Sequence, residues 1–214
     1  MRLVRHRSAL PASIVLPRRW RRYGFNTLVV AIIAAGLVCA RSAKTPVQSD
    51  DWKRYHDRSF RVAYVVDGDT LDIDVPDGDK NVTRIRLWGV DTPEPGRGGK
   101  PDMHFSGEAK AFAEQTLAGR RVHVVLSPKR TRGKYGRLLA YVFLKRGGPM
   151  FNEMLLEEGY AYADLRFDHH YYKRFQGVEK RARTAGVGLW TEVTLDKMPA
   201  WKQRFERRAS KSGG

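Results

Sequence analysis

Cysteine is almost absent from the 214-residue sequence, and this scarcity excludes two kinds of small protein. The one cysteine, Cys39, cannot form a disulfide framework within the chain, nor can it build a cysteine-based zinc site. Stability must therefore come from an ordinary hydrophobic core. Hydrophobic residues make up 42% of the sequence and aromatic residues 11%, which is enough for a globular domain and argues against disorder throughout.

Acidic residues are absent from the first 40 positions, which hold seven arginines. Without those arginines the chain keeps 33 basic residues against 23 acidic ones, a net charge of +10. That charge favours polyanionic partners, because each phosphate neutralised by a basic side chain releases a condensed counterion. Charge alone leaves two interpretations open, a nucleic-acid-binding domain and a solvated basic surface.

The apolar run at residues 28–40, LVVAIIAAGLVCA, has 13 residues and falls short of the roughly 20 that a membrane span needs. Its length suits the core of a signal peptide cleaved before Arg41, whereas the long arginine-rich leader before it favours either a retained anchor or a start codon placed too early. In both cases the arginines stay inside and the following chain lies outside. We therefore expect residues 1–43 to be a signal peptide or membrane anchor, and the protein to be secreted or membrane-anchored outside the cytoplasm.

The remainder of the chain has no internal repeat and reads as one domain between two polar segments. Residues 44–51 (KTPVQSDD) are predicted to be a linker, and residues 52–192 to form the domain. Residues 193–214 form a basic tail that ends in Ser and Gly and shows no clear core pattern. The sequence indicates no role for this tail.

Strand patterns dominate the first part of the domain and helix patterns the second. Turn sequences and alternating apolar residues predict five strands, and glycine stops help to delimit three helices. This content predicts an α+β fold, mainly β, in which a small closed barrel is covered by helices. The expected strands are residues 60–66, 71–75, 82–88, 122–126 and 138–144, and the expected helices are residues 106–117, 152–158 and 172–185.

Two short acidic segments follow strands in this pattern. Residues 67–70 (DGDT) connect the first two strands, and residues 91–94 (DTPE) follow the third. Each has a purely structural interpretation, because Asp-Gly is a favoured hairpin turn and two carboxylates near a proline can cap a helix or end a strand.

A functional interpretation joins the two segments into one metal site. Hard cations such as calcium take oxygen ligands from carboxylates, backbone carbonyls and water. Asp69 and Asp91 can supply the carboxylates, and Thr92 can supply a carbonyl held by the following proline. Glu94 would then lie near the metal, where it could orient or deprotonate an attacking water.

A third cluster, residues 132–137 (RGKYGR), leads into the last strand. It can be a solvated basic loop, or it can bind phosphate, since the planar fork of arginine matches two phosphate oxygens. Arg86, at the end of its strand, would point to the same place as Arg137 if the barrel closes. Together the clusters predict phosphodiester hydrolysis, in which a metal polarises the phosphate, Glu94 handles the water and both arginines neutralise transition-state charge.

These segments resemble the staphylococcal nuclease (thermonuclease) family. The matching stretches are VVDGDTLDI at 65–73, RIRLWGVDTPE at 84–94, KYGRLLAYV at 134–142, FNEMLLEEGYA at 151–161 and EKRARTAGVGLW at 179–190. The resemblance implies a five-stranded OB-fold barrel with three packed helices, and calcium-dependent hydrolysis of single-stranded or locally melted DNA and RNA. We expect a monomer without an obligate protein partner.

The resemblance also implies a role for individual residues. Carried onto this sequence, it assigns calcium ligation to Asp69, Asp91 and the Thr92 carbonyl, an outer-shell position to Asp67, general-base catalysis to Glu94, phosphate stabilisation to Arg86 and Arg137, and nucleotide contacts to Lys134 and Tyr135.

The sequence departs from the family pattern at two places. Gly133 stands where the family often has an acid, and Leu165 and Phe167 stand where tyrosines normally meet the nucleotide. Because base stacking needs only a π face, Phe167 is predicted to bind substrate in their place.

Two other functions remain open at this point. The chain could be a nucleic-acid-binding module that kept the fold and lost the activity, although such modules usually lack the acids and arginines found here. It could also be a membrane-anchored protein that captures nucleic acid for uptake. Neither alternative needs calcium, so calcium-dependent cleavage separates them from a nuclease.

Overall fold

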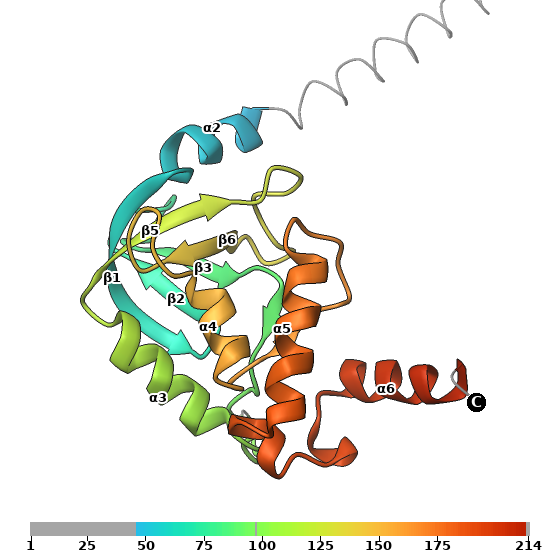
Figure 1. Ribbon diagram of the computed structural model, residues 1–214. Coiled ribbons are helices and arrows are strands. Elements are labelled where there is room, and N and C mark those ends of the chain that lie inside the picture. The colour runs from blue at the N-terminus through green and yellow to red at the C-terminus, as the bar shows by residue number, and fades with distance from the viewer. Residues whose placement is uncertain (1–45, 97, 213–214) are drawn as a thin grey trace, which may run out of the picture. The chain divides into compact units, whose positions relative to one another are not determined.

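Five strands close into a barrel in the order β1-β2-β3-β6-β5 in the computed structural model, which describes residues 46–96 and 98–212 (Figure 1). This confirms the predicted α+β fold with its five-stranded barrel. The leader predicted for residues 1–43, with its apolar run, lies outside the described residues. The barrel strands are β1 (Arg58–Asp67), β2 (Thr70–Ile73), β3 (Thr83–Leu87), β5 (Arg121–Leu126) and β6 (Leu138–Phe143).

Strand β3 shows how the sequence pattern builds the barrel. Ile85 and Leu87 are buried, Arg84 is exposed and Arg86 is half-buried, as the alternation of aliphatic and basic residues predicts. The strand pairs antiparallel with β2 on one side and parallel with β6 on the other. The parallel pairing aligns Arg86 with Leu139, two residues after Arg137, and so brings the two predicted catalytic arginines to adjacent strands.

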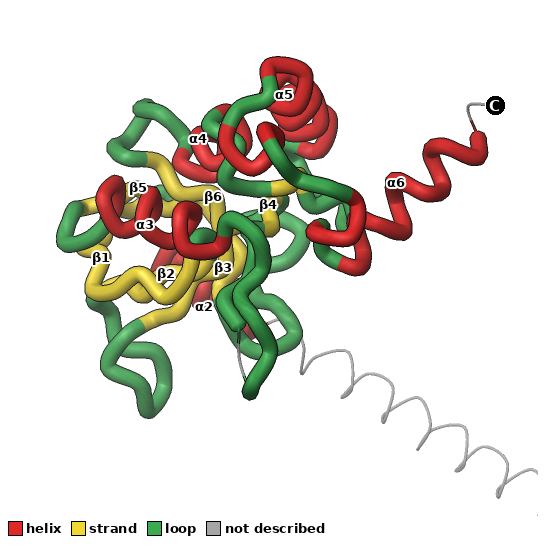
Figure 2. The backbone as a smooth tube through the Cα atoms, turned by 90° about the horizontal axis from the view of Figure 1, so that it is seen from below, coloured by secondary structure: helices red, strands yellow, loops and turns green. Residues whose placement is uncertain are grey.

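Three helices pack around the barrel, as predicted: α3 (Ser106–Leu117), α4 (Phe151–Glu157) and α5 (Tyr172–Ala185) (Figures 1 and 2). Helix α5 ends at Gly186, whose positive φ of 61° gives the left-handed cap that glycine accepts without strain. Asn152, buried in α4, accepts a hydrogen bond from the Val142 amide and donates to the Trp88 carbonyl (3.0 Å). These bonds tie α4 to the segment that follows β3.

A second, two-stranded sheet pairs β4 (Val90–Asp91) with β7 (Tyr162–Ala163). The sequence pattern did not predict it, because strands of two residues carry no periodic signal. Its register places Asp91 opposite Tyr162. A predicted metal ligand therefore lies beside the segment that follows α4.

Helix α2 (Pro46–Tyr55) occupies most of the segment that was predicted to be a linker. The Asp51 side chain is buried, and it accepts hydrogen bonds from Arg132 (2.6 and 2.8 Å) and Thr131 (3.1 Å). The segment looked like a linker because it is polar. Its order comes instead from these ion-pair and hydrogen-bond contacts with residues about 80 positions away.

The predicted tail also contains helical structure: after the short helix η1 (Gly188–Thr191) come η2 (Leu195–Lys197) and α6 (Ala200–Ser212). Met198 and Trp201 are buried in a small cluster with Tyr162 and Trp190. Lys202 is 2% exposed and pairs with Glu179 (2.8 Å). The buried side chains of α6 lie in its first turn, and Glu206 adds one ion pair with Arg183 (3.0 Å), which is too little to give the tail a core pattern. Of the helices in the described ranges, none has the length and apolarity needed to cross a membrane.

Candidate active site

A cleft of about 520 Å³ opens at the end of β3 and β4. Its wall is completed by the loop before β6 and by the segment after β7. The predicted site residues converge on it from four separate parts of the sequence. Those that line the cleft are Arg86, Asp91, Glu94, Lys134, Tyr135, Arg137 and Phe167.

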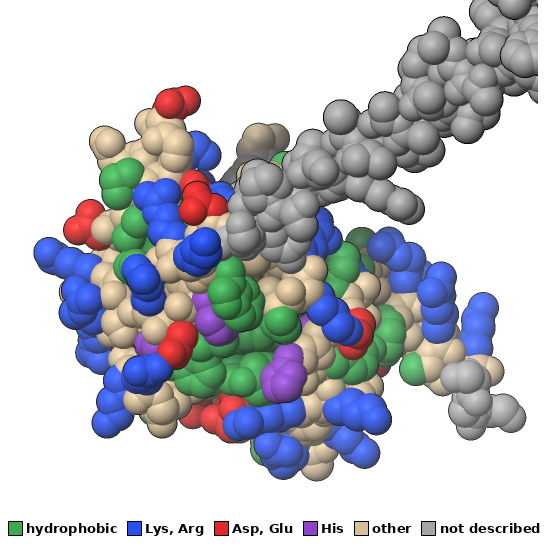
Figure 3. All heavy atoms as spheres, turned by 90° about the horizontal axis from the view of Figure 1, so that it is seen from above, with side chains coloured by type: hydrophobic (Ala, Val, Ile, Leu, Met, Phe, Trp, Pro, Cys, Tyr) green, Lys and Arg blue, Asp and Glu red, His purple; other side chains and the backbone are tan. Residues whose placement is uncertain are grey.

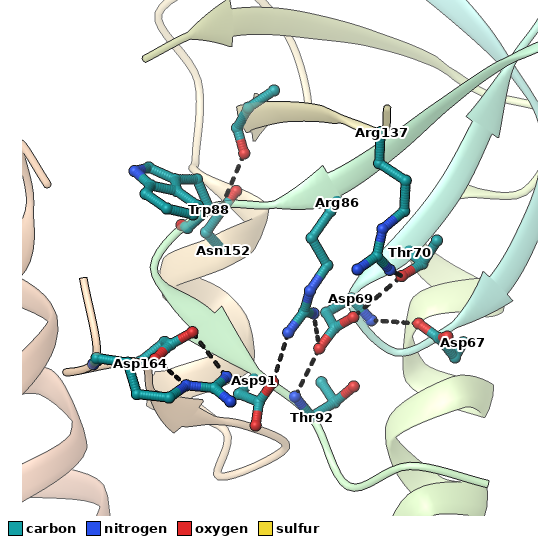
Figure 4. Close-up of polar contacts among 12 residues, drawn as sticks. Asp67, Asp69, Thr70, Arg86, Trp88, Asp91, Thr92, Arg137, Asn152 and Asp164 are labelled. Carbon is teal, nitrogen blue, oxygen red and sulfur yellow. Dashed lines mark hydrogen bonds and ion pairs between the residues drawn. The ribbon is translucent and has the colours of Figure 1, made fainter. Parts of the chain in front are cut away.

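Asp69 is buried next to Arg86, one of the cleft residues, in a turn that fixes both of its carboxylate oxygens (Figure 4). Its Oδ1 accepts a hydrogen bond from the Thr70 hydroxyl (3.1 Å), and its Oδ2 accepts one from the Thr92 amide (2.7 Å). Asp67 Oδ1 accepts a hydrogen bond from the Asp69 amide (3.2 Å). Residues 67–70 thus form the turn that their sequence favours, and that turn also holds Asp69 against Thr92.

Arg86 joins the two predicted carboxylate ligands. Its guanidinium forms ion pairs with Asp69 and with Asp91, the latter at 2.5 Å (Figure 4). Burial lowers the pKa of Arg86, and the Asp91 carboxylate opposes that shift. Arg86 therefore places positive charge between two buried carboxylates that would otherwise repel each other.

The residues present fit a hard cation at this position. Among residues 46–96 and 98–212, no cluster of three or more His, Cys, Asp or Glu is arranged to hold a metal ion. The predicted direct ligands are of a different kind, since they are two carboxylates and the main-chain carbonyl of Thr92. Oxygens of Asp69 and Asp91 contact one guanidinium, so both fall within reach of a single ion. All-oxygen donors of this type suit calcium.

Arg137 reaches the same region from the loop before β6 (Figure 4). Its Nη1 lies 3.5 Å from the Thr70 hydroxyl, which in turn donates to Asp69. The contact is at the outer limit of a hydrogen bond, so it holds the guanidinium only weakly. Glu94 is exposed and lines the cleft, and its main-chain carbonyl accepts a hydrogen bond from Met103 (3.0 Å).

Arg132 holds the basic loop that carries Lys134 and Tyr135. It pairs with Asp51 of α2 (2.6 Å) and with Asp77 (2.7 Å), and it donates to the Gly136 carbonyl (2.8 Å). The family often places an acid at position 133. Here acids from two distant parts of the chain hold the loop through Arg132, and Lys134 and Tyr135 remain exposed.

Phe167 is 44% exposed and lies on the wall of the cleft. Its ring stacks on Trp88 with the centroids 5.4 Å apart. Leu165 is half-buried and packs against the core. Of the two positions where the sequence departs from the family tyrosines, Phe167 therefore presents an aromatic surface to the cleft.

Three residues at this site were not predicted from the sequence: Asp164, Arg166 and Trp201. Arg166 pairs with Asp164 (2.7 Å) and with Asp91 (3.1 Å), and its guanidinium lies 4.6 Å from the centre of the Trp201 ring. The Trp201 indole donates to Asp91 Oδ2 (2.7 Å). The sequence shows Arg166 beside Phe167 and Trp201 within the basic tail, but the spacing of neither residue indicates a contact with Asp91.

Comparison with known proteins agrees with this geometry. The family described as "Staphylococcal nuclease homologue" matches residues 84–192. The thermonuclease of Staphylococcus hyicus is 31% identical over 170 residues, which cover 78% of this chain and 97% of the relative. The thermonuclease of Staphylococcus intermedius is 35% identical over 133 residues, 62% of this chain and 76% of the relative. Endonuclease YncB of Bacillus subtilis is 28% identical over 129 residues, 59% of each chain. The fold, the cleft and these matches lead to one conclusion: the chain belongs to the staphylococcal nuclease family.

Proposed function

We propose that this protein is a calcium-dependent nuclease that hydrolyses phosphodiester bonds of DNA or RNA in the cleft beside β3 and β4. The observation that carries the proposal is the meeting of two carboxylates, two arginines and a glutamate at one cleft. Asp69 and Asp91 share a guanidinium, and Arg86, Arg137 and Glu94 line the opening above them. This set contains a cation site, charge stabilisation for a phosphate and a group that can accept a proton.

Each of these residues has a distinct part in the reaction. Asp69, Asp91 and the Thr92 carbonyl would hold calcium, while Asp67 fixes the main chain at Asp69. Bound calcium supplies positive charge that polarises the scissile phosphate. The fork-shaped guanidinium groups of Arg86 and Arg137 match the phosphate oxygens, on which negative charge grows in the transition state.

Glu94 is the general base in this proposal. It lines the cleft, as Asp91 does, and follows Asp91 by three residues in the sequence. It would accept a proton from the attacking water, a step that requires a carboxylate within hydrogen-bond reach of that water.

Substrate contacts come from the exposed rim of the cleft. Lys134 and Tyr135 lie on the loop that Arg132 holds, and Phe167 offers an aromatic surface on the other wall. A cation, a phenol and a stacking surface suit the phosphates and bases of an unpaired strand, because stacking does not depend on base identity.

Replacing both acids in Asp69→Asn/Asp91→Asn tests the proposal. The amides keep the shape of the site but remove the charge that holds a hard cation. We expect cleavage of single-stranded DNA to fall by at least about 10²-fold, the usual loss when metal chemistry or one stabilising charge is removed. Binding of the same strand, measured by fluorescence anisotropy, should persist through the basic rim.

Asp72→Asn is the matched control, because Asp72 pairs with Arg84 on the neighbouring strand and does not line the cleft. Cleavage by the folded double variant at the rate of this control would contradict the proposal. If the wild-type protein in calcium binds single-stranded DNA without cleaving it, the result would instead support a protein that captures nucleic acid.

Trp201→Phe should weaken calcium binding by about 10-fold, which is typical when a partner of a metal ligand is lost. The substitution keeps an aromatic ring against Arg166 but removes the indole N–H that donates to Asp91. Isothermal titration with calcium measures this effect without relying on activity. Trp190→Phe is the control, because Trp190 belongs to the same buried cluster and its indole N–H has no hydrogen-bond partner among the described residues. Equal calcium affinities for both variants would show that the Trp201 indole does not position Asp91.

A further inference from the structure

Helix α6 begins at the active-site cleft, although it lies beyond the residues 84–192 that match the family. Its first turn carries Trp201, which donates to Asp91 and packs under the guanidinium of Arg166. Asp91 and Arg166 both line the cleft. The start of α6 is therefore fixed at the rim of the cleft, and the helix extends away from the barrel (Figures 1 and 2).

The two sides of α6 differ in their contacts. One side faces the domain, where Trp201 and Lys202 are buried and Glu206 pairs with Arg183 (3.0 Å) and Lys202 (3.4 Å). The other side carries four exposed basic residues, and the space-filling view shows mainly Lys and Arg along the projecting helix (Figure 3). These four residues, called the basic stripe below, are Arg204, Arg207, Arg208 and Lys211.

The spacing of the basic stripe is that of a single helix face. Its members lie at positions i, i+3, i+4 and i+7, which fall within an arc of about 100° around the helix axis. Like charges this close repel one another, so the arrangement opposes helix stability in the absence of an anion. Along the axis the stripe spans about 10 Å, the length of about three phosphates of one strand at the spacing in duplex DNA.

We propose that the basic stripe binds phosphates of the nucleic-acid strand that continues beyond the cleft, so that α6 extends the substrate-binding surface past the scissile bond. This inference rests on the proposed function. Arg166 connects the two regions, because it lines the cleft and stacks on the first turn of α6. Arg204, the first residue of the stripe, follows Trp201 by three positions in α6, so it lies about 4.5 Å further along the helix axis.

The composition of α6 favours nucleic acid over a membrane surface. An interfacial helix needs a broad apolar face to insert between lipids. In α6 Trp201 is buried against the domain, which leaves Phe205, 39% exposed, as the large apolar side chain that the described part of the helix exposes. The helix therefore presents positive charge along one face, where an anionic partner can bind, and little apolar area lies beside that charge.

The test compares substrates that do and do not reach α6. The stripe variant Arg204→Gln/Arg207→Gln/Arg208→Gln/Lys211→Gln removes four charges while keeping residues that favour helix. Its control, Arg58→Gln/Arg61→Gln/Lys80→Gln/Arg120→Gln, removes four exposed charges that do not line the cleft. Anisotropy with labelled oligothymidylates of 4 and 16 nucleotides, in chelator and at several salt concentrations, reports binding without cleavage.

For the 16-mer, the stripe variant should reduce the slope of log affinity against log salt by about two to three, at roughly 0.7 per phosphate contact. Affinity for the 4-mer should change by less than about twofold, and the control should keep the wild-type slope for both. Equal losses in the two variants, or equal losses on the two strands, would overturn the proposal. An unchanged slope together with lost binding to phosphatidylserine vesicles would overturn it in favour of a membrane.

Cleavage of the 4-mer by the wild-type protein in calcium is measured separately. A lack of cleavage would contradict the proposed function. It would not affect the test of the stripe, because binding is measured in chelator without cleavage. Circular dichroism of both variants checks that α6 and the barrel remain folded.

Discussion

Replacing Glu94 with Gln is expected to lower the rate of phosphodiester cleavage by about 10²- to 10⁴-fold, the usual contribution of a general base. The amide has nearly the same shape as the carboxylate but cannot accept a proton from water at neutral pH. Glu94 is exposed at the cleft, so the substitution should leave folding unchanged. Single-turnover cleavage of a single-stranded oligonucleotide in saturating calcium isolates the chemical step.

Two further measurements make the result for Glu94→Gln specific. Calcium affinity should stay within about threefold of wild type, because the proposed direct ligands are Asp69, Asp91 and the Thr92 carbonyl. Glu108→Gln, at an exposed position in the first turn of α3, should cleave at the wild-type rate. A folded Glu94→Gln protein with an undiminished rate would rule out Glu94 as the base.

The second large effect is expected for Arg137→Lys, which should slow cleavage by about 10²- to 10³-fold, as when one transition-state donor is lost. Lysine keeps the charge but presents a point charge in place of the planar fork that contacts two phosphate oxygens. The Arg137 guanidinium lies 3.5 Å from the Thr70 hydroxyl, which is the outer limit of a hydrogen bond. Its replacement should therefore disturb the fold very little.

Arg84→Lys provides the matched comparison for Arg137→Lys. Arg84 is also next to a buried acid in the barrel, since it pairs with Asp72 at 2.8 Å, but it does not line the cleft. We expect wild-type kcat for Arg84→Lys and a large fall in kcat for Arg137→Lys, with equal thermal midpoints. Equal kcat values for the two variants would mean that the guanidinium of Arg137 does not stabilise the transition state.

The barrel was predictable because its signals are local. The alternation of Ile85 and Leu87 with Arg84 and Arg86 gave the strand and its buried face, and the structure agrees. Helices α3 and α5 have the predicted bounds, since glycines follow each of them and apolar residues recur along them. The resemblance then named candidate site residues, and the structure places part of that set along one cleft: Arg86, Asp91, Glu94, Lys134, Tyr135, Arg137 and Phe167.

The parts that were missed depend on contacts between distant residues. Trp201 donates to Asp91 across 110 positions, and Arg132 meets Asp51 across 81. Such pairs leave no spacing that a sequence pattern can detect. The β4–β7 sheet is too short to show a period, and α6 meets the domain through the buried residues of its first turn and one ion pair from Glu206. As a result, the segments predicted to be a linker and a tail contain residues that support the site. Asp51 of α2 holds the loop of Arg132, and Trp201 of α6 donates to Asp91.

Arg86 illustrates a different limit of sequence analysis. Its position at the end of β3 predicted a phosphate-binding group. The structure shows that it also pairs with both acids of the proposed calcium site. This charge balance depends on burial and on side chains from β3, from β4 and from the turn between β1 and β2, so no single stretch of sequence encodes it.

The most direct test of the account is digestion of single-stranded DNA by the purified protein in millimolar calcium and in a calcium-specific chelator. For a calcium-dependent nuclease we expect cleavage in calcium and none above background in the chelator, with activity restored when calcium is added back. Cleavage that continues undiminished in the chelator would contradict calcium dependence. Binding without cleavage by folded protein in calcium would contradict the nuclease itself.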